Sequence, residues 1–167
     1  KGMAEANIRA FADSNQDKKY DALITLASGC GATLKEYDSQ FQGGDNEVHR
    51  LTERVCDIST FIASAISTQA LPDGIGLNSL RRRVLVHNPC SLRHVMKEGS
   101  GVATMLGHIP EIDLLELPPS TPCCGAAGSY MLDQPTMADR LKAGLQDSIT
   151  AQAPDLVVTS NIGCSMH

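Results

Sequence analysis

The sequence lacks the features that mark a membrane-spanning or nucleic-acid-binding protein. Among its 167 residues no run of about 18 consecutive apolar residues occurs, which excludes a membrane-spanning helix within it. Its net charge of −5 provides no excess of positive charge with which to bind nucleic acid. It also contains no recognisable Ser-His-Asp set, no pair of catalytic carboxylates and no phosphate-binding loop. Function therefore has to be inferred from what is present, above all from cysteine.

Four of the six cysteines are grouped in a pattern that predicts a shared site. They are Cys90, the adjacent pair Cys123 and Cys124, and Cys164. Each group follows a short apolar run that predicts a buried strand, and these runs are residues 84–86, 113–117 and 155–159. Loops at the carboxyl ends of parallel strands converge on one crevice, so we expect the four sulfur atoms to lie in one pocket.

The chemistry of sulfur limits what such a pocket would hold. Thiolates are soft ligands, suited to an iron–sulfur cluster or to zinc. Neighbouring cysteines such as Cys123 and Cys124 seldom pair with each other, and nothing in the sequence indicates secretion, so metal or redox use in the cytoplasm is preferred to disulfides. A helix beginning directly after Gly125 would point N–H groups at the sulfur atoms. Of the other two thiols, Cys56 is expected to pack within a helix, and Cys30 lies apart.

An internal repeat relates the two ends of the chain. A shift of 134 positions, from Cys30 to Cys164, aligns residues 3–30 with residues 137–164 without a gap. Both copies predict an amphipathic helix, a buried strand and a Gly-Cys pair in the same order. The first copy has no counterpart of Cys90 or of the Cys-Cys-Gly sequence, which would fall before the first residue. We therefore expect two similar halves, of which the first is incomplete.

The spacing of apolar residues predicts an α/β fold. The expected helices are 3–14, 32–41, 47–68, 91–106 and 136–151, and the expected strands are 21–26, 83–87, 113–117 and 155–159. Alternating helices and buried strands predict a parallel sheet flanked by helices on both faces. Residues 1–79 would form the incomplete half, ending in a long helix and a link at 71–79, and residues 80–167 would form the complete half.

The segments around the cysteines resemble a known family. The likeness is carried by residues 28–37, 88–94, 122–130 and 159–167, which include Asn-Pro-Cys-Ser-Leu-Arg-His and Pro-Cys-Cys-Gly-Ala-Ala-Gly-Ser-Tyr. They resemble the cysteine-rich CCG domain, which occurs in pairs in heterodisulfide reductase B subunits. They are most similar to the carboxyl-terminal region of the iron–sulfur subunit of bacterial glycolate oxidase. Two features depart from these patterns: His167 replaces the last cysteine of a C-x-x-C motif, and ferredoxin-type cysteine runs are absent.

The resemblance carries expectations about cofactor, partners and location. It implies an iron–sulfur cluster of the 4Fe–4S type on the four grouped thiols, with His167 as a further candidate ligand and Cys30 as the remaining thiol of the incomplete first site. It implies a non-flavin, electron-transfer subunit whose FAD-binding partners oxidise glycolate, in the cytoplasm or peripherally at the inner face of the plasma membrane. The chain alone is not expected to oxidise glycolate.

Three alternatives remain open from the residues alone. The thiols would hold a structural zinc ion in an assembly module, or they would form a thiol–disulfide site of the heterodisulfide reductase kind. The chain would otherwise be part of an iron–sulfur protein of lactate utilisation. The metal that binds to protein handled without oxygen distinguishes the first alternative from an iron–sulfur domain.

Overall fold

The computed structural model describes residues 2–14, 20–41, 46–68 and 76–167. Residues 71–75 of the predicted link lie outside this described part. The first elements are α1 (Gly2–Ser14), β1 (Leu23–Thr25), α2 (Ser28–Lys35), α3 (Tyr37–Gln40), α4 (Asn46–Arg54), β2 (Val55–Asp57) and α5 (Ile58–Thr68). They are followed by β3 (Arg83–His87), the π-helical turn η1 (Ser91–Met96), α6 (Gly101–Leu106), β4 (Asp113–Glu116), α7 (Tyr130–Asp133), α8 (Pro135–Gln152), β5 (Leu156–Thr159) and α9 (Ile162–Met166). Within the described ranges no helix combines the length and the apolar character needed to cross a bilayer.

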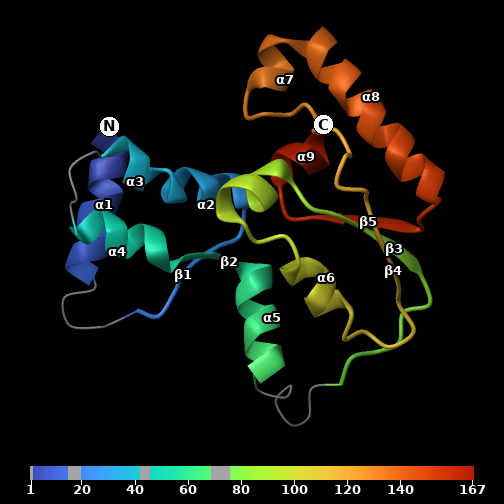
Figure 1. Cartoon of the computed structure of the whole chain (residues 1–167), viewed down its shortest axis with the longest axis horizontal. Coiled ribbons are helices and arrows are strands. Elements are labelled where there is room, and N and C mark those ends of the chain that lie inside the picture. The colour runs from blue at the N-terminus through green and yellow to red at the C-terminus, as the bar shows by residue number, and fades with distance from the viewer. Residues whose placement is uncertain (1, 15–19, 42–45, 69–75) are drawn as a thin grey trace.

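The strands form two parallel sheets whose carboxyl ends face each other (Figure 1). One sheet pairs β1 with β2, and the other has the order β4-β3-β5 with β3 in the centre. The two sheets meet beyond the ends of β1 and β5, where the Ser28 N–H donates to the Ser160 carbonyl oxygen over 3.4 Å. The predicted α/β class with parallel strands flanked by helices is confirmed, although the strands belong to two sheets rather than one.

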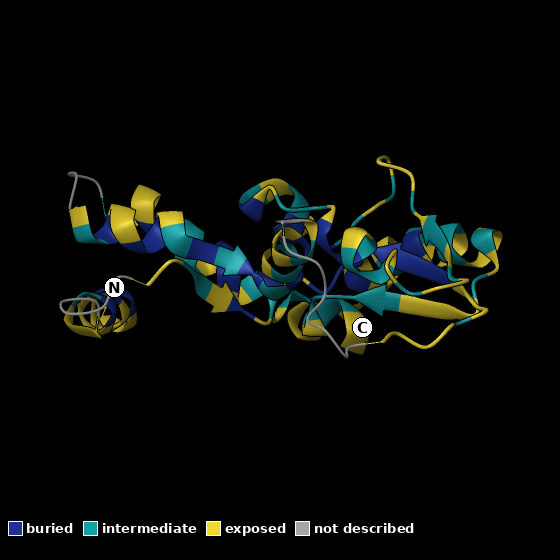
Figure 2. Ribbon diagram, turned by 90° about the horizontal axis from the view of Figure 1, so that it is seen from below, coloured by how far each residue is buried: buried dark blue, intermediate teal, exposed yellow. Residues whose placement is uncertain are grey.

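Burial is uneven across the larger sheet. Val84, Leu85 and Val86 of β3 are at most 2% exposed, whereas Leu156 and Val157 of β5 are 48% and 46% exposed. Buried positions, dark blue in Figure 2, are spread along the molecule rather than gathered in one central mass. The apolar side of α8 packs on the thiol-bearing segment instead of across β5. The expectation that helices cover both faces of the sheet is therefore wrong for β5.

The long helix predicted for residues 47–68 is interrupted by β2. Val55, Cys56 and Asp57 lie opposite Leu23–Thr25 in a parallel ladder, and Cys56 is on this strand rather than in a helix. The Asp57 carboxylate accepts hydrogen bonds from the N–H and the hydroxyl of Ser59, in the first turn of the new helix α5, which begins at Ile58. Apolar spacing remained continuous through the break because a three-residue strand buries its residues as a helix would. The prediction of one helix here is wrong.

The helix predicted for residues 91–106 is also divided. It ends at Met96, where Lys97 adopts a left-handed conformation with φ of 59°, and α6 begins at Gly101. Leu92 and Met96 of η1 are buried in the core that α1, α2 and α4 build. This packing joins the sequence around Cys90 to the first part of the chain. The division into halves at residues 79 and 80 stays a prediction.

Candidate metal centre

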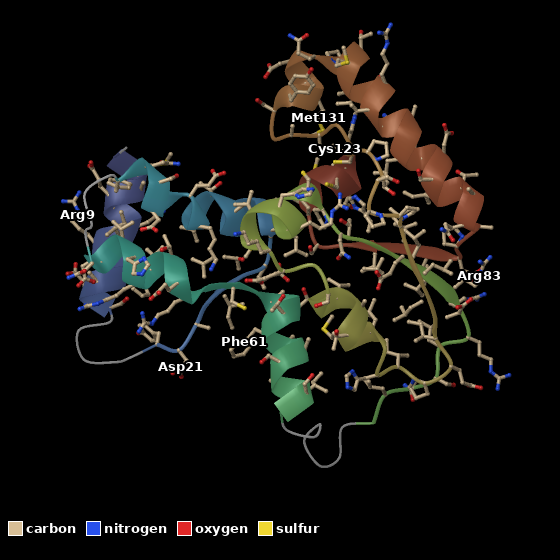
Figure 3. The ribbon with its side chains drawn as sticks, in the orientation of Figure 1. Arg9, Asp21, Phe61, Arg83, Cys123 and Met131 are labelled. Carbon is tan, nitrogen blue, oxygen red and sulfur yellow. The ribbon has the colours of Figure 1, made fainter. Side chains whose placement is uncertain are left out.

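Three loops of the larger sheet carry the grouped thiols. Cys90 is exposed in the loop between β3 and η1, and Cys164 is the third residue of α9, which follows β5. Cys123 and Cys124 lie between β4 and α7, and Cys124 is only 4% exposed. Cys124 forms a small core with Leu145 of α8, against which Cys123 and Cys164 also pack. Figure 3 shows Cys123 beside Met131, another member of this cluster.

The four thiols are arranged as two close pairs. The Cys124 and Cys164 sulfur atoms are 2.9 Å apart, and the Cys90 and Cys123 sulfur atoms are 4.0 Å apart. A tetrahedral zinc ion bound at about 2.3 Å would place its sulfur ligands roughly 3.8 Å apart. Within the described part of the chain, no three His, Cys, Asp or Glu side chains are already arranged to hold one metal ion. That all four thiols share one centre therefore stays a prediction.

Backbone N–H groups approach the sulfur atoms from a turn. The Gly125 N–H donates to the Cys123 sulfur over 3.4 Å, and the Ala126 N–H is hydrogen-bonded to the Cys124 sulfur. Gly125, Ala127 and Gly128 all have positive φ, so the chain reverses here and α7 does not begin until Tyr130. The expectation that a helix directly after Gly125 supplies these donors is wrong; consecutive amides of a left-handed turn supply them.

The Cys124 thiol is acidified by its surroundings. The Cys164 S–H donates to the Cys124 sulfur, and the Ala126 N–H adds a second hydrogen bond, which together lower the Cys124 pKa to about 6. Burial opposes this shift. The Cys164 pKa is raised because the Cys164 proton is held between the two sulfur atoms. Burial raises the Cys123 pKa. The Cys124–Cys164 pair therefore carries one negative charge at neutral pH.

The remaining predicted residues have different positions. His167 follows α9, and its Nε2 atom is buried without a hydrogen-bond partner among the described residues. Cys30 is exposed on α2, on a segment separate from the three loops that carry the grouped thiols. Cys56 is half-buried, and burial, followed by the charges of Glu98 and Asp57, raises its pKa. A protonated thiol of this kind agrees with the packing role predicted for Cys56.

Asn161 is a site residue that sequence reasoning missed. Its side-chain oxygen accepts hydrogen bonds from the N–H groups of Gly163 at 2.9 Å and Cys164 at 3.3 Å, and it thereby caps α9. The signal was present in the sequence Asn-Ile-Gly-Cys, because asparagine is a preferred residue directly before a helix. This cap fixes the orientation of the segment that carries Cys164.

Comparison with known proteins identifies the family of this chain. The sequence profile of the CCG cysteine-rich domain matches residues 84–167, which is 84 of the 167 residues. The chain belongs to the CCG cysteine-rich domain family. The matched part of this CCG protein contains β3, β4 and β5 and all four grouped thiols.

Several curated proteins are similar to this CCG protein. The glycolate oxidase iron-sulfur subunit of Escherichia coli is 29% identical over 88% of this chain and 35% of its own length. A subunit of the fumarate reductase (CoM/CoB) of Methanothermobacter marburgensis is 31% identical over 99% of this chain and 30% of its own. Lactate utilization protein A of Geobacillus thermodenitrificans is 24% identical over 96% of this chain and 64% of its own length. The chain thus spans about a third of the first two relatives. No solved structure gives a significant match.

Proposed function

We propose that this chain is part of the iron–sulfur subunit of a glycolate-oxidising oxidoreductase. In this role it passes electrons from an FAD-binding partner subunit toward a respiratory acceptor, and it acts in the cytoplasm or at the inner face of the plasma membrane through its partners. The observation that carries the proposal is the close approach of Cys90 to Cys123 and of Cys124 to Cys164, which brings thiols of three separate loops together in two pairs. The similarity to a glycolate oxidase iron-sulfur subunit supports glycolate as the substrate of the whole enzyme.

The residues at this position suit an iron–sulfur cluster of the 4Fe–4S type. All four sulfur donors are soft ligands, and the buried His167 Nε2, without a partner among the described residues, is a further polar atom that a bound group would satisfy. When bound, such a cluster supplies one-electron transfer. Cys124 brings negative charge as a thiolate, and the N–H groups of Gly125 and Ala126 stabilise charge on sulfur. Ala126, 2% exposed, helps to exclude water.

Two alternatives have an observation in their favour. The 4.0 Å separation of the Cys90 and Cys123 sulfur atoms is close to that of two ligands on one zinc ion, as in a structural assembly module. The 2.9 Å contact of Cys124 with Cys164, together with the low pKa of Cys124, suits a thiol–disulfide site. An iron–sulfur role in lactate utilisation uses the same thiols and differs in the substrate of the whole enzyme.

Metal analysis after purification without oxygen tests the proposal. The chain, supplied with iron and sulfide, should bind both, show visible absorbance and give an electron paramagnetic resonance signal on reduction. Cys124→Ser should abolish binding, whereas Cys56→Ser, a substitution at a thiol outside the site, should leave it intact. Zinc without sulfide would favour the assembly module, and a Cys124–Cys164 disulfide without metal would favour thiol–disulfide chemistry. Glycolate oxidation by the chain alone would contradict the assignment to a non-flavin subunit.

A further inference from the structure

A partly buried polar junction connects the thiol site to the first part of the chain. The Asn161 side-chain N–H₂ donates to the Ser28 hydroxyl at 3.1 Å and to the Ser91 hydroxyl at 3.3 Å. The two hydroxyls also share a hydrogen bond of 2.9 Å, and Ser28 is fully buried. The three side chains Asn161, Ser28 and Ser91 therefore form a closed hydrogen-bonded triangle, which we call the Asn161 junction.

The two serines of the Asn161 junction lie close to cysteines in the sequence. Ser91 directly follows Cys90, and Ser28 precedes Cys30 by two positions on α2. The opposite end of the Asn161 side chain holds the Cys164 N–H through its oxygen atom. A single amide side chain thus connects the Cys164 backbone to the residue beside Cys90. Both ends of the amide are used, one for capping α9 and one for joining the loops.

The strand ladder alone does not extend to these loops. Pairing of β3 with β5 ends at His87 and Thr159, whose side chains also share a hydrogen bond of 3.1 Å. Beyond this rung the chains leave the sheet, so the spacing between the Cys90 and Cys164 loops depends on side-chain contacts. The Ser28 hydroxyl is fully buried, so the loss of its hydrogen bonds would destabilise the fold, and this makes the bonded junction a stiff connection.

We propose that Asn161 is a positioning residue for the thiol site, acting through Ser28 and Ser91. It holds the Cys90 and Cys164 loops at a fixed separation before any metal centre is bound. The proposal rests on the proposed function for its metal, and on the hydrogen bonds within the chain for its geometry. Residues that orient ligands from behind change metal affinity roughly 10- to 100-fold when they are replaced.

Two variants, one single and one double, separate the two roles of the Asn161 side chain. Asn161→Ser keeps a residue that caps helices about as well as asparagine but is too short to reach both serines. Ser28→Ala combined with Ser91→Ala removes the two hydroxyls to which the Asn161 side-chain N–H₂ donates, and leaves the Asn161 oxygen free to cap α9 as before. Ser160→Ala is the matched control, because the Ser160 hydroxyl is buried beside the junction without a hydrogen-bond partner among the described residues.

The first measurement uses protein loaded with iron and sulfide. Loss of visible absorbance in excess chelator should be roughly 10- to 100-fold faster for Asn161→Ser and for the double serine variant than for the unsubstituted chain. Ser160→Ala should stay within about twofold of it. Combining Asn161→Ser with the serine substitutions should give no further acceleration, because all remove the same junction. Rates equal to that of Ser160→Ala would overturn the proposal and leave the proposed function standing.

The second measurement uses metal-free protein and does not depend on the proposed function. Alkylation of Cys164, resolved by mass spectrometry of its peptide, should be roughly tenfold faster in Asn161→Ser, because its loop opens more readily. Alkylation of Cys56 in the same sample should not change. If the unsubstituted chain binds no iron, the proposed function fails and this assay alone decides the positioning role. If Asn161→Ser does not fold, the double serine variant provides both measurements.

Discussion

Replacing Gly125 by alanine should destabilise the protein far more than the same change at Gly128. Both glycines lie in the turn after the cysteine pair, and both have positive φ, 84° and 66° respectively. They differ in what surrounds them. A Cβ atom at Gly125 would lie 2.5 Å from the Ala138 carbonyl oxygen and 3.2 Å from the Ala138 Cα, whereas a Cβ atom at Gly128 would meet nothing within 4 Å.

The two effects can be separated in free energy of unfolding. A left-handed backbone costs an alanine about 1–2 kcal/mol, and this penalty applies at both positions. The loss of unfolded-state freedom offsets about 0.4–1 kcal/mol of this penalty, so Gly128→Ala should destabilise by about 1.6 kcal/mol at most. At Gly125 the backbone of α8 must also move away from the new methyl group, which adds about 1–3 kcal/mol as in other overpacked sites. The difference between the variants should therefore be about 1–3 kcal/mol.

Urea unfolding of the two variants, followed by circular dichroism, measures this difference directly. The denaturant slope should be the same in both, so that the shift in midpoint reports stability alone. In the Gly125→Ala variant the Cys123 and Cys124 thiols should also react faster with alkylating reagents, because the methyl group displaces the turn. Equal destabilisation by the two substitutions would refute the conclusion that close contact with Ala138 requires glycine here.

Three further outcomes are expected. In metal-free protein, ultraviolet absorbance should show the Cys124 thiolate forming near pH 6, because Cys164 donates a hydrogen bond to Cys124. Cys164→Ala should move this midpoint up toward the ordinary value of 9.0. An unchanged midpoint would contradict the shared proton. Burial lowers the pKa of His87 below its ordinary 6.5, so the protein should lose stability as pH falls from 6.5 toward that lowered pKa, where the unfolded chain takes up a proton and the folded protein does not; an NMR titration midpoint at or above 6.5 would disprove this. Asp57→Ala should reduce the unfolding free energy by about 1–2 kcal/mol, because Asp57 would no longer accept the hydrogen bonds of Ser59 that cap α5. Asp57→Asn should reduce it by less, and thermal unfolding measures both.

The sequence was most informative where burial and topology act together. The strands at Arg83–His87 and Leu156–Thr159 are close to their predicted positions, because apolar runs of that length bounded by polar residues have few other conformations in a folded chain. The rule that parallel strands end at a common edge predicted that the Cys124 and Cys164 segments approach each other. In the structure their sulfur atoms are in contact.

The sequence was least informative where tertiary contacts override local pattern. Val55–Asp57 has the apolar spacing of the surrounding helices, and only its pairing with Leu23–Thr25 makes it a strand. Lys97 ends a predicted helix in a left-handed conformation that its residue type does not indicate. The pairing of Asn161 with Ser28 spans 133 positions, and no single-sequence pattern reports a contact at that separation. The turn amides at Gly125 and Ala126 were missed because their direction depends on backbone angles rather than residue identity.

The wide sequence separation within the Asn161 junction has a consequence for biosynthesis. Ser28 leaves the ribosome 133 residues before Asn161, and Cys90 leaves it 74 residues before Cys164, so the thiol pocket stays open during most of translation of this region. Contacts between residues this far apart form late, because closing a long loop has to precede them. A metal centre of the proposed kind would therefore be inserted only after α9 is complete. Until that moment Cys90, Cys123 and Cys124 are unprotected thiols, and a nascent chain stalled before Cys164 would be the form most vulnerable to oxidation.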